Sequence, residues 1–334
     1  MNLLRSYPET SRDRRAYILS SQLLWAVTAA LLLTVAVLIA LSPIELRDSP
    51  LPLNVMTLVV FGPVALIYTY LRFDVRIASL CDSVALLSAF ALIGAAYTYV
   101  MTYLGAGVAF WDPRFQAADA ALGLNWRSYL AWLNMHALLG SALNSAYRSI
   151  LTQTAVLIVV LVALGQHRRL QSFILAAQLC IIVCGAAAAI MPALGPYTAF
   201  GIVPAVDHPI IPLTVMNGPV AQILQLRGAA PFLQFDGIEG IIVFPSFHMA
   251  LSILFAWAFW RVLLVRWVTL ALNIVMAAGT PLSGAHYFVD IVGGAFVALV
   301  AIGAASALER MIDRIVAGSP HSQRISPAVQ MVQR

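Results

Sequence analysis

Long apolar runs are the feature that most constrains this fold. Each extends over about 20 residues, enough for a helix to cross the hydrocarbon core of a bilayer, and the first runs from Tyr17 to Leu41. A membrane β-barrel would show shorter segments, of about 10 residues, in which polar and apolar side chains alternate. The pattern therefore predicts an all-α protein, a polytopic bundle of transmembrane helices.

The composition excludes a soluble domain. Hydrophobic residues make up 61% of the chain and charged residues 10%, whereas a typical soluble domain has about 25% charged residues. We therefore expect an integral membrane protein that is surrounded by membrane lipids.

Eight segments are candidate spans. They are residues 17–42, 53–71, 77–104, 148–165, 171–191, 246–264, 267–280 and 286–308, of which the seventh is the shortest. Together they predict one membrane domain over 17–308, between an N-terminal segment, 1–16, and a polar, loosely ordered tail, 309–334. An even number of spans puts both termini on the same side of the membrane.

The arginines indicate which side that is. The net charge is +5, and all nineteen basic residues are arginines. With the N-terminus inside, fourteen fall on the cytoplasmic side and five on the outer side, namely Arg47, Arg114, Arg127, Arg148 and Arg227. Because cytoplasmic loops carry the excess of basic residues, we expect both termini in the cytoplasm, and we take the membrane to be a bacterial inner membrane. No basic stripe with interleaved aromatic residues indicates nucleic-acid binding.

The two long outer loops differ in character. In the first, 105–147, Trp126, Tyr129 and Trp132 recur at helical spacing, which predicts a helix at the membrane interface that either anchors the chain or guides a lipid substrate. His136 in the same loop is expected to be structural. The second loop, 192–245, is rich in glycine and proline, which argues against a continuous helix. Elsewhere, Cys180 and Cys184 lie in an apolar run and are expected to be packing residues.

Polar residues stand at the start of the sixth span, in "FPSFH" (244–248). Pro245 suits the first turn of a helix, where its missing N–H costs no hydrogen bond, and Ser246 suits the cap. His248 then lies in the first turn, at the outer face. The free N–H groups and the positive end of the helix dipole favour an anion there.

The last span begins with "HYFVDIVGG" (286–294). His286 and Asp290 are four residues apart and so share a helical face. The carboxylate can accept the Nδ1 proton and stabilise an imidazolium, which makes the imidazole a better base or nucleophile. A carboxylate within an apolar span is costly, so its presence indicates a function. Gly293 and Gly294 allow another helix to come close.

The predicted topology places His248 and His286 in one layer. Two imidazoles, a carboxylate and helix N-termini suit phosphoryl transfer, in which one histidine attacks phosphorus and the other protonates the leaving oxygen. Two other interpretations stay open at this point. The histidines can be polar residues that merely lie at the membrane boundary, or they can belong to a metal site, although the outer loops show no recognisable ligand spacing.

The motifs "PSFH" and "HYFVD" resemble the second and third signatures of the type 2 phosphatidic acid phosphatase superfamily, P-S-G-H and S-R-x5-H-x3-D. They look most like the branch that contains inositol phosphorylceramide synthases, which moves a phosphate-bearing headgroup between lipids. The resemblance implies that His286 is the nucleophile that forms a phosphohistidine, that Asp290 orients it, and that His248 is the general acid and then the base. It also implies that Ser246 and nearby N–H groups hold phosphate oxygens, with no metal or other cofactor.

The chain departs from the family pattern in its phosphate-binding residues. Phe247 replaces the glycine of P-S-G-H, and Gly279 and Thr280 stand where the S-R pair would fall. The first signature, K-x6-R-P, is impossible because the sequence has no lysine and no Arg-Pro pair. A dianionic phosphate still needs positive partners, for which Arg227 and then Arg148 are the candidates, while Phe247 is a candidate for the acceptor or lipid pocket.

The resulting prediction is an enzyme that transfers a phosphate-bearing headgroup, of the inositol phosphate type, from a lipid to an alcohol at the outer, periplasmic face. With water as the acceptor, the same residues would make a metal-independent phosphatase of lipid phosphates or isoprenyl diphosphates. A non-catalytic lipid transporter or binding protein is the second alternative. The motifs do not specify the lipid, the acceptor or the oligomeric state.

Overall fold

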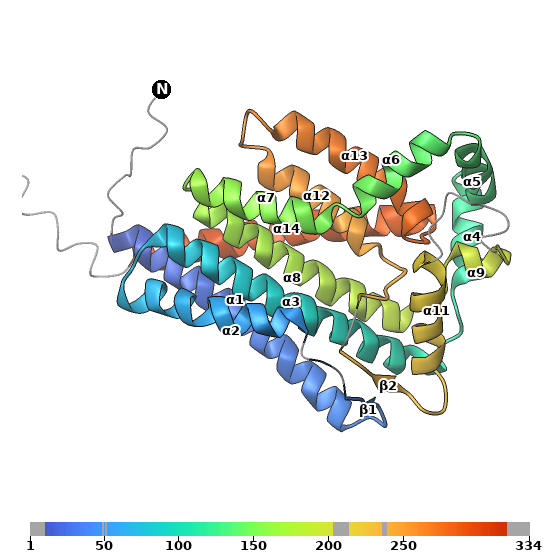
Figure 1. The fold of residues 1–334 in the computed structure, drawn as a ribbon, viewed down its shortest axis with the longest axis horizontal. Coiled ribbons are helices and arrows are strands. Elements are labelled where there is room, and N and C mark those ends of the chain that lie inside the picture. Colours follow the sequence, from blue (N-terminus) through green and yellow to red (C-terminus); the bar gives the residue numbers. More distant parts are fainter. Residues whose placement is uncertain (1–10, 49, 51, 203–213, 236–238, 319–334) are drawn as a thin grey trace, which may run out of the picture.

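Each of the eight expected spans folds into a helix. The computed structural model describes residues 11–48, 50, 52–202, 214–235 and 239–318. The helices that match expected spans are α1 (Ser11–Ala40), α2 (Leu53–Leu66) with the π-helical turn η1 (Ile67–Leu71), α3 (Val75–Leu104), α7 (Ile150–Ala163), α8 (His167–Ile190), α12 (Phe247–Phe259), α13 (Arg266–Ser283) and α14 (Phe288–Ala317). The all-α prediction is confirmed (Figure 1).

Shorter elements connect these helices. They are the 3-10 turn η2 (Gly105–Gly107), α4 (Asp112–Ala121), α5 (Trp126–Asn134), α6 (Ala137–Tyr147), α9 (Pro196–Phe200), α11 (Thr214–Leu226) and the strands β1 (Glu45–Leu46) and β2 (Phe232–Leu233), which pair in parallel. Figure 1 shows α4, α5, α9 and α11 at one end of the long helices. The first outer loop is therefore helical over most of its length, and the described part of the second contains two short helices.

Not every expected span is long enough to cross a membrane alone. Within the described residues, five helices qualify by length and composition: α1, α2 with η1, α3, α8 and α14. The pair α6 and α7 qualifies jointly, although the two are bent by 51° at their junction. The helix α12 ends at Phe259, short of the expected 264, and its 13 residues are too few for a single crossing.

The ends of the helices sort into two groups. At one end of the bundle, Ile312 and Val316 near the end of α14 pack with Ala16 near the start of α1. Asp313 there also pairs with Arg168 at 3.2 Å. These contacts explain why α14 continues to Ala317, well beyond the point at which a loose tail was expected. The helix α14 therefore begins at the opposite end of the bundle, among α4 and its neighbours (Figure 1).

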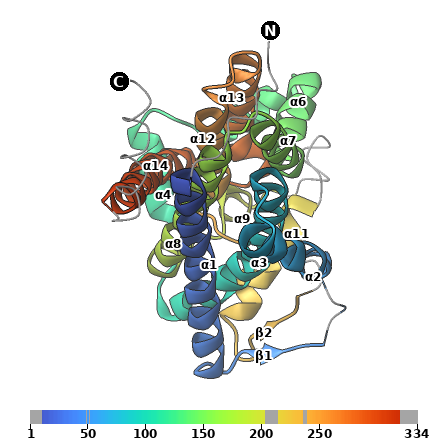
Figure 2. The ribbon, with the colours of Figure 1, turned by 90° about the vertical axis from the view of Figure 1, so that its left-hand side faces the viewer.

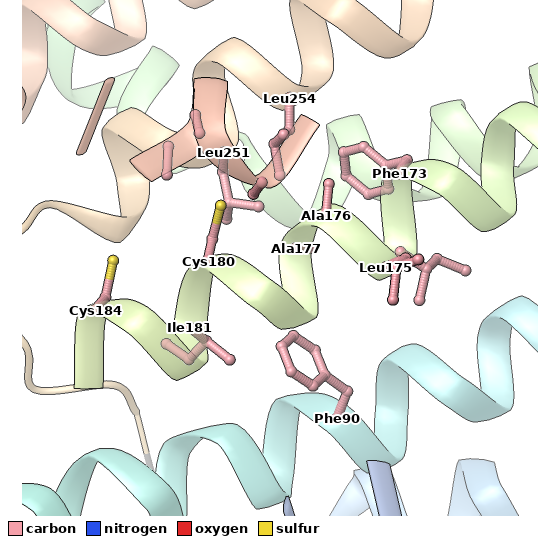
Figure 3. Packing of buried hydrophobic residues seen from close by; sticks show 14 of the residues in the cluster. Phe90, Phe173, Leu175, Ala176, Ala177, Cys180, Ile181, Cys184, Leu251 and Leu254 are labelled. Carbon is pink, nitrogen blue, oxygen red and sulfur yellow. The ribbon is translucent and has the colours of Figure 1, made fainter. Parts of the chain in front are cut away.

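The helix α8 forms the middle of the bundle. It contacts α3, α14, α12 and α1, and Figure 2 shows α1 and α3 side by side. Small residues allow the close approach: a Cβ on Gly185 would collide with the ring of Tyr97. Cys180 and Cys184 are fully buried and face α12 (Figure 3), as expected for packing residues. This core fixes α12 and α14 on one side of α8.

The helices α12 and α14 cross at their first turns. A Cβ on Gly294 would collide with the carbonyl oxygen of Ser246, and one on Gly293 would come within 2.9 Å of the ring of Phe244. The backbone N–H of Ser246 donates to the carbonyl oxygen of Asp290 at 3.0 Å. The glycine pair thus allows the close helix approach that the sequence predicts.

This crossing gives a direct prediction for Gly294→Ala. The added methyl group must push α12 away from α14, so we expect the free energy of unfolding to fall by about 1–3 kcal/mol. Unfolding of the purified protein in mixed micelles with increasing sodium dodecyl sulfate measures the change.

The matched control is Gly303→Ala in the same helix. A Cβ there meets nothing within 4 Å, so we expect a change within about 0.5 kcal/mol. Equal stability of the two variants would show that the crossing is not tight.

Candidate active site

Ser246 caps the helix that carries His248. Its backbone is extended, and its Oγ accepts a hydrogen bond from the N–H of Met249 at 3.3 Å. Ser246 is fully buried. The cap was therefore predicted correctly, whereas Pro245 precedes the cap and does not lie in the first turn as expected. The cap places His248 within the first turn, beside the crossing with α14.

His286 lies in the short turn between α13 and α14, before the N-cap Tyr287, and not within the last helix on one face with Asp290 as predicted. Its Nδ1 is 3.3 Å from Oδ2 of Asp290, and both side chains are buried, with exposed fractions of 3% and 0%. The same Oδ2 accepts the N–H of Tyr287 at 2.8 Å. The predicted histidine–carboxylate pair is therefore present, and it leaves Nε2 of His286 as the nitrogen on the side away from the carboxylate.

The turn itself is unusual at Ala285. Its φ of 53° lies in the left-handed region, which non-glycine residues seldom adopt. A Cβ on Gly195, at the start of α9, would come within 2.6 Å of the carbonyl oxygen of Ala285. Close packing by α9 therefore holds the backbone that presents His286.

Asp119 of α4 holds the start of α14. Asp119 accepts the N–H groups of Phe288 and Val289 at 3.0 and 2.8 Å. Burial raises the pKa of Asp119, whereas the hydrogen bonds from these two N–H groups lower it. Negative charge at a helix N-terminus is favourable, because the free N–H groups and the helix dipole point at it. The dipole end of α14 is thus occupied by the protein itself.

Asp112 connects the same region to α9. Its carboxylate accepts the N–H groups of Leu194 and Gly195 at 2.9 to 3.2 Å and the hydroxyl of Tyr287 at 2.9 Å. Burial raises the pKa of Tyr287 above its usual range. Neither carboxylate was predicted to belong to the site, because nothing in "DPRFQAADA" indicates which backbone N–H groups they will bind. Their spacing of seven on one short helix was the only signal.

His248 contacts a residue of α6. Its ring stacks on that of Tyr147, with the centroids 4.0 Å apart and the planes at 8°. His248 is half-buried, and the hydroxyl of the same Tyr147 lies near His286, since a Cβ on Gly284 would be 2.7 Å from this hydroxyl and 2.6 Å from Cδ2 of His286. The structure therefore brings the two histidines and Asp290 together, as predicted.

The remaining predicted site residues lie elsewhere. The side chain of Phe247 packs against the main hydrophobic core. Arg148 is exposed at the junction of α6 and α7, next to Tyr147. Arg227 donates to the carbonyl oxygens of Gly105 and Val108, each at 2.5 Å. Within the described residues, no hydrogen bond, ion pair or ring contact joins Arg227 to either histidine, so it would have to leave these carbonyls to bind a phosphate.

The aromatic residues of α5 do more than face a membrane. Trp126 is buried and donates from Nε1 to the carbonyl oxygen of Pro281 at 3.3 Å. Tyr129 donates to the carbonyl oxygen of Ala278 at 2.5 Å. The helix was correctly predicted, but two of its three aromatic residues tie it to the end of α13, and only Trp132 is exposed. His136 is bonded within its own loop, Nδ1 lying 2.8 Å from the carbonyl oxygen of Trp132.

A cavity of about 220 Å³ opens beside the start of α14. Its lining comes from α4, α5, α9 and the turn before α14, and consists of Gln116, Asp119, Ala120, Leu124, Asn125, Trp126, Arg127, Phe200 and Tyr287.

No group of three His, Cys, Asp or Glu side chains that could hold a metal ion occurs in the described part of the chain.

A family model matches the region that contains these elements. The model, described as "PAP2 superfamily", covers residues 113–304, from α4 to within α14. The chain belongs to the PAP2 superfamily. No curated protein and no solved structure matches it. PAP2 membership agrees with the resemblance seen in "PSFH" and "HYFVD" and supports an enzyme that acts on lipid phosphates in a membrane, as a phosphatase or a phosphotransferase.

The contacts of Asp119 lead to a second prediction. In Asp119→Ala the N–H groups of Phe288 and Val289 lose their acceptor, so we expect a loss of about 0.5–2 kcal/mol in the free energy of unfolding. We also expect faster hydrogen–deuterium exchange in the peptide that contains residues 286–290, which mass spectrometry measures.

Asp313→Ala is the matched control, because this carboxylate lies in an exposed ion pair at the other end of α14. Such pairs contribute about 0–1 kcal/mol, and exchange at 286–290 should not change. Unchanged exchange in Asp119→Ala would contradict the role of Asp119.

Proposed function

We propose that this PAP2 protein transfers a phosphate-bearing headgroup, of the inositol phosphate type, from a lipid to an alcohol through a phosphohistidine on His286. The observation that carries the proposal is the buried His286–Asp290 pair beside His248, where α12 and α14 cross. Membership of the PAP2 superfamily supports a lipid phosphate as the substrate.

The first step forms the covalent intermediate. Nε2 of His286 attacks phosphorus while its Nδ1 proton stays toward Asp290, whose carboxylate stabilises the positive charge that develops on the ring. The bond between phosphorus and the oxygen of the leaving diacylglycerol breaks. That oxygen takes a proton from the imidazolium of His248, which becomes neutral.

The second step reverses these roles. The hydroxyl of the acceptor gives its proton to the neutral imidazole of His248 as its oxygen attacks phosphorus. The bond between phosphorus and Nε2 breaks, and His286 returns to its starting state. Protons and charges balance over the two steps without a metal ion or a redox partner.

The burial of the pair favours an alcohol over water as the acceptor. His286 is only 3% exposed, and a site from which water is excluded protects a reactive intermediate from hydrolysis. Hydrolysis of a lipid phosphate or an isoprenyl diphosphate would use the same residues and is the competing outcome.

The positive-inside distribution of arginines supports placing this site at the outer, periplasmic face, with both termini in the cytoplasm. The helices at the two ends of the described chain fit this placement, since the start of α1 and the end of α14 lie together, at the end of the bundle opposite His286. Arg148 directly follows Tyr147, the residue stacked on His248, and we propose it as the predicted cation that faces the anionic headgroup.

The third prediction concerns substrate and nucleophile. Purified protein is given phosphatidylinositol with ceramide, phosphatidic acid, or an isoprenyl diphosphate, each with and without chelator. We expect the inositol phosphate to be transferred to ceramide, with turnover unaffected by chelator. His286→Gln should lower turnover by at least about a thousandfold, because the nucleophile is removed.

His136→Gln is the control, since this exposed imidazole is bonded to the carbonyl oxygen of Trp132 and packs against the ring of the same residue, and we expect normal turnover. Release of free phosphate as the sole product would instead assign a phosphatase. Full turnover by His286→Gln would overturn the mechanism, and binding without any product would favour a non-catalytic lipid carrier.

A further inference from the structure

Tyr147 lies at the centre of the site, yet neither family signature includes it. It is the last residue of α6, a helix of the first outer loop. Its ring lies flat on that of His248, with an interplanar angle of 8°. A parallel ring contact of this kind restricts rotation of the imidazole. His248 is therefore held from the side of α6.

The hydroxyl of Tyr147 lies beside the catalytic edge of His286. An ideal Cβ on Gly284 would be 2.7 Å from this hydroxyl and 2.6 Å from Cδ2 of His286. The two groups therefore flank the same small volume. Cδ2 is bonded directly to Nε2, whereas Nδ1 faces Asp290 on the other side of the ring. The hydroxyl therefore lies at most 5.3 Å from Cδ2, the ring carbon that is bonded to Nε2.

The helix α6 packs against the part of α13 where the family signature has its Ser-Arg pair. In the family signature, the arginine would stand at Thr280, but Thr280 is fully buried and donates its hydroxyl to Met276 of its own helix at 3.0 Å. At the preceding position, a Cβ on Gly279 would come within 2.7 Å of the carbonyl oxygen of Leu143. Tyr147 is one helical turn beyond Leu143, on the same face of α6.

We propose that Tyr147 is a further residue of this site: its ring positions His248, and its hydroxyl donates a hydrogen bond to an oxygen of the phosphoryl group, where the family signature has an arginine. The inference rests on the proposed function.

The hydroxyl of Tyr147 attracts a dianion less strongly than a guanidinium does, because it carries no charge. A phosphodiester, such as a lipid headgroup ester, has one negative charge at the phosphate, so its binding requires fewer positively charged groups. Tyr147 therefore fits a headgroup donor better than a phosphate monoester.

The test compares Tyr147→Phe, which keeps the stacked ring and removes only the hydroxyl, with Tyr147→Leu, which removes both. Steady-state rates are measured with phosphatidylinositol and with phosphatidic acid in mixed micelles. We expect Tyr147→Phe to lower kcat for phosphatidylinositol by about 10- to 100-fold, with KM changed far less, because the hydrogen bond tightens in the transition state. Tyr147→Leu should lose about tenfold more, because His248 is no longer held.

Tyr97→Phe is the matched control. Its hydroxyl donates to the carbonyl oxygen of Ile182 at 3.1 Å, within the core between α3 and α8. Any loss of folding caused by removing a tyrosine hydroxyl should therefore appear in both variants, whereas a loss of kcat should appear only in Tyr147→Phe. A kcat for Tyr147→Phe equal to that of Tyr97→Phe would overturn the inference. Its failure is distinguishable from failure of the proposed function: in the first case His286→Gln is still inactive, and in the second it retains turnover.

Discussion

The contact between the first turns of α12 and α14 is the constraint on which the site depends. Gly294 leaves room for the carbonyl oxygen of Ser246, and the N–H of Ser246 binds the carbonyl oxygen of Asp290. The residue that caps the helix of His248 is thus bonded to the residue that orients His286. Since the two helices are fixed at this point, the two imidazoles are fixed relative to each other. Two interactions then complete the arrangement: Asp119 holds α14 from α4, and Tyr147 holds His248 from α6.

Much of this arrangement could be predicted from the sequence because it is local. The apolar runs predicted the helices, Ser246 predicted the cap of α12, and the spacing of four residues predicted the His286–Asp290 pair. Gly293 and Gly294 correctly predicted a close helix crossing. Each of these signals spans only a few residues at the end of a helix, where capping and short sequence separation restrict the geometry.

The partners that come from distant segments could not be predicted in this way. Asp112, Asp119 and Tyr147 are each more than 80 positions from the residues that they hold, with separations from 82 for Asp112 and Leu194 to 175 for Asp112 and Tyr287. Arg227 was selected because it lies in an outer loop, but a side chain of that length can reach several partners, and it binds the carbonyl oxygens at the end of α3. The end of α14 was placed too early because the contacts of Ile312 and Val316 with α1 are also long-range.

The central claim is that His286 becomes covalently bonded to phosphorus during turnover. The most direct measurement is rapid mixing of the full chain with phosphatidylinositol in the absence of an acceptor alcohol, followed by quenching at alkaline pH and peptide mass spectrometry. The account predicts an inositol phosphate adduct on His286 that is labile to acid and disappears when the acceptor is added. Turnover without an adduct, or an adduct on a residue other than His286, would contradict it.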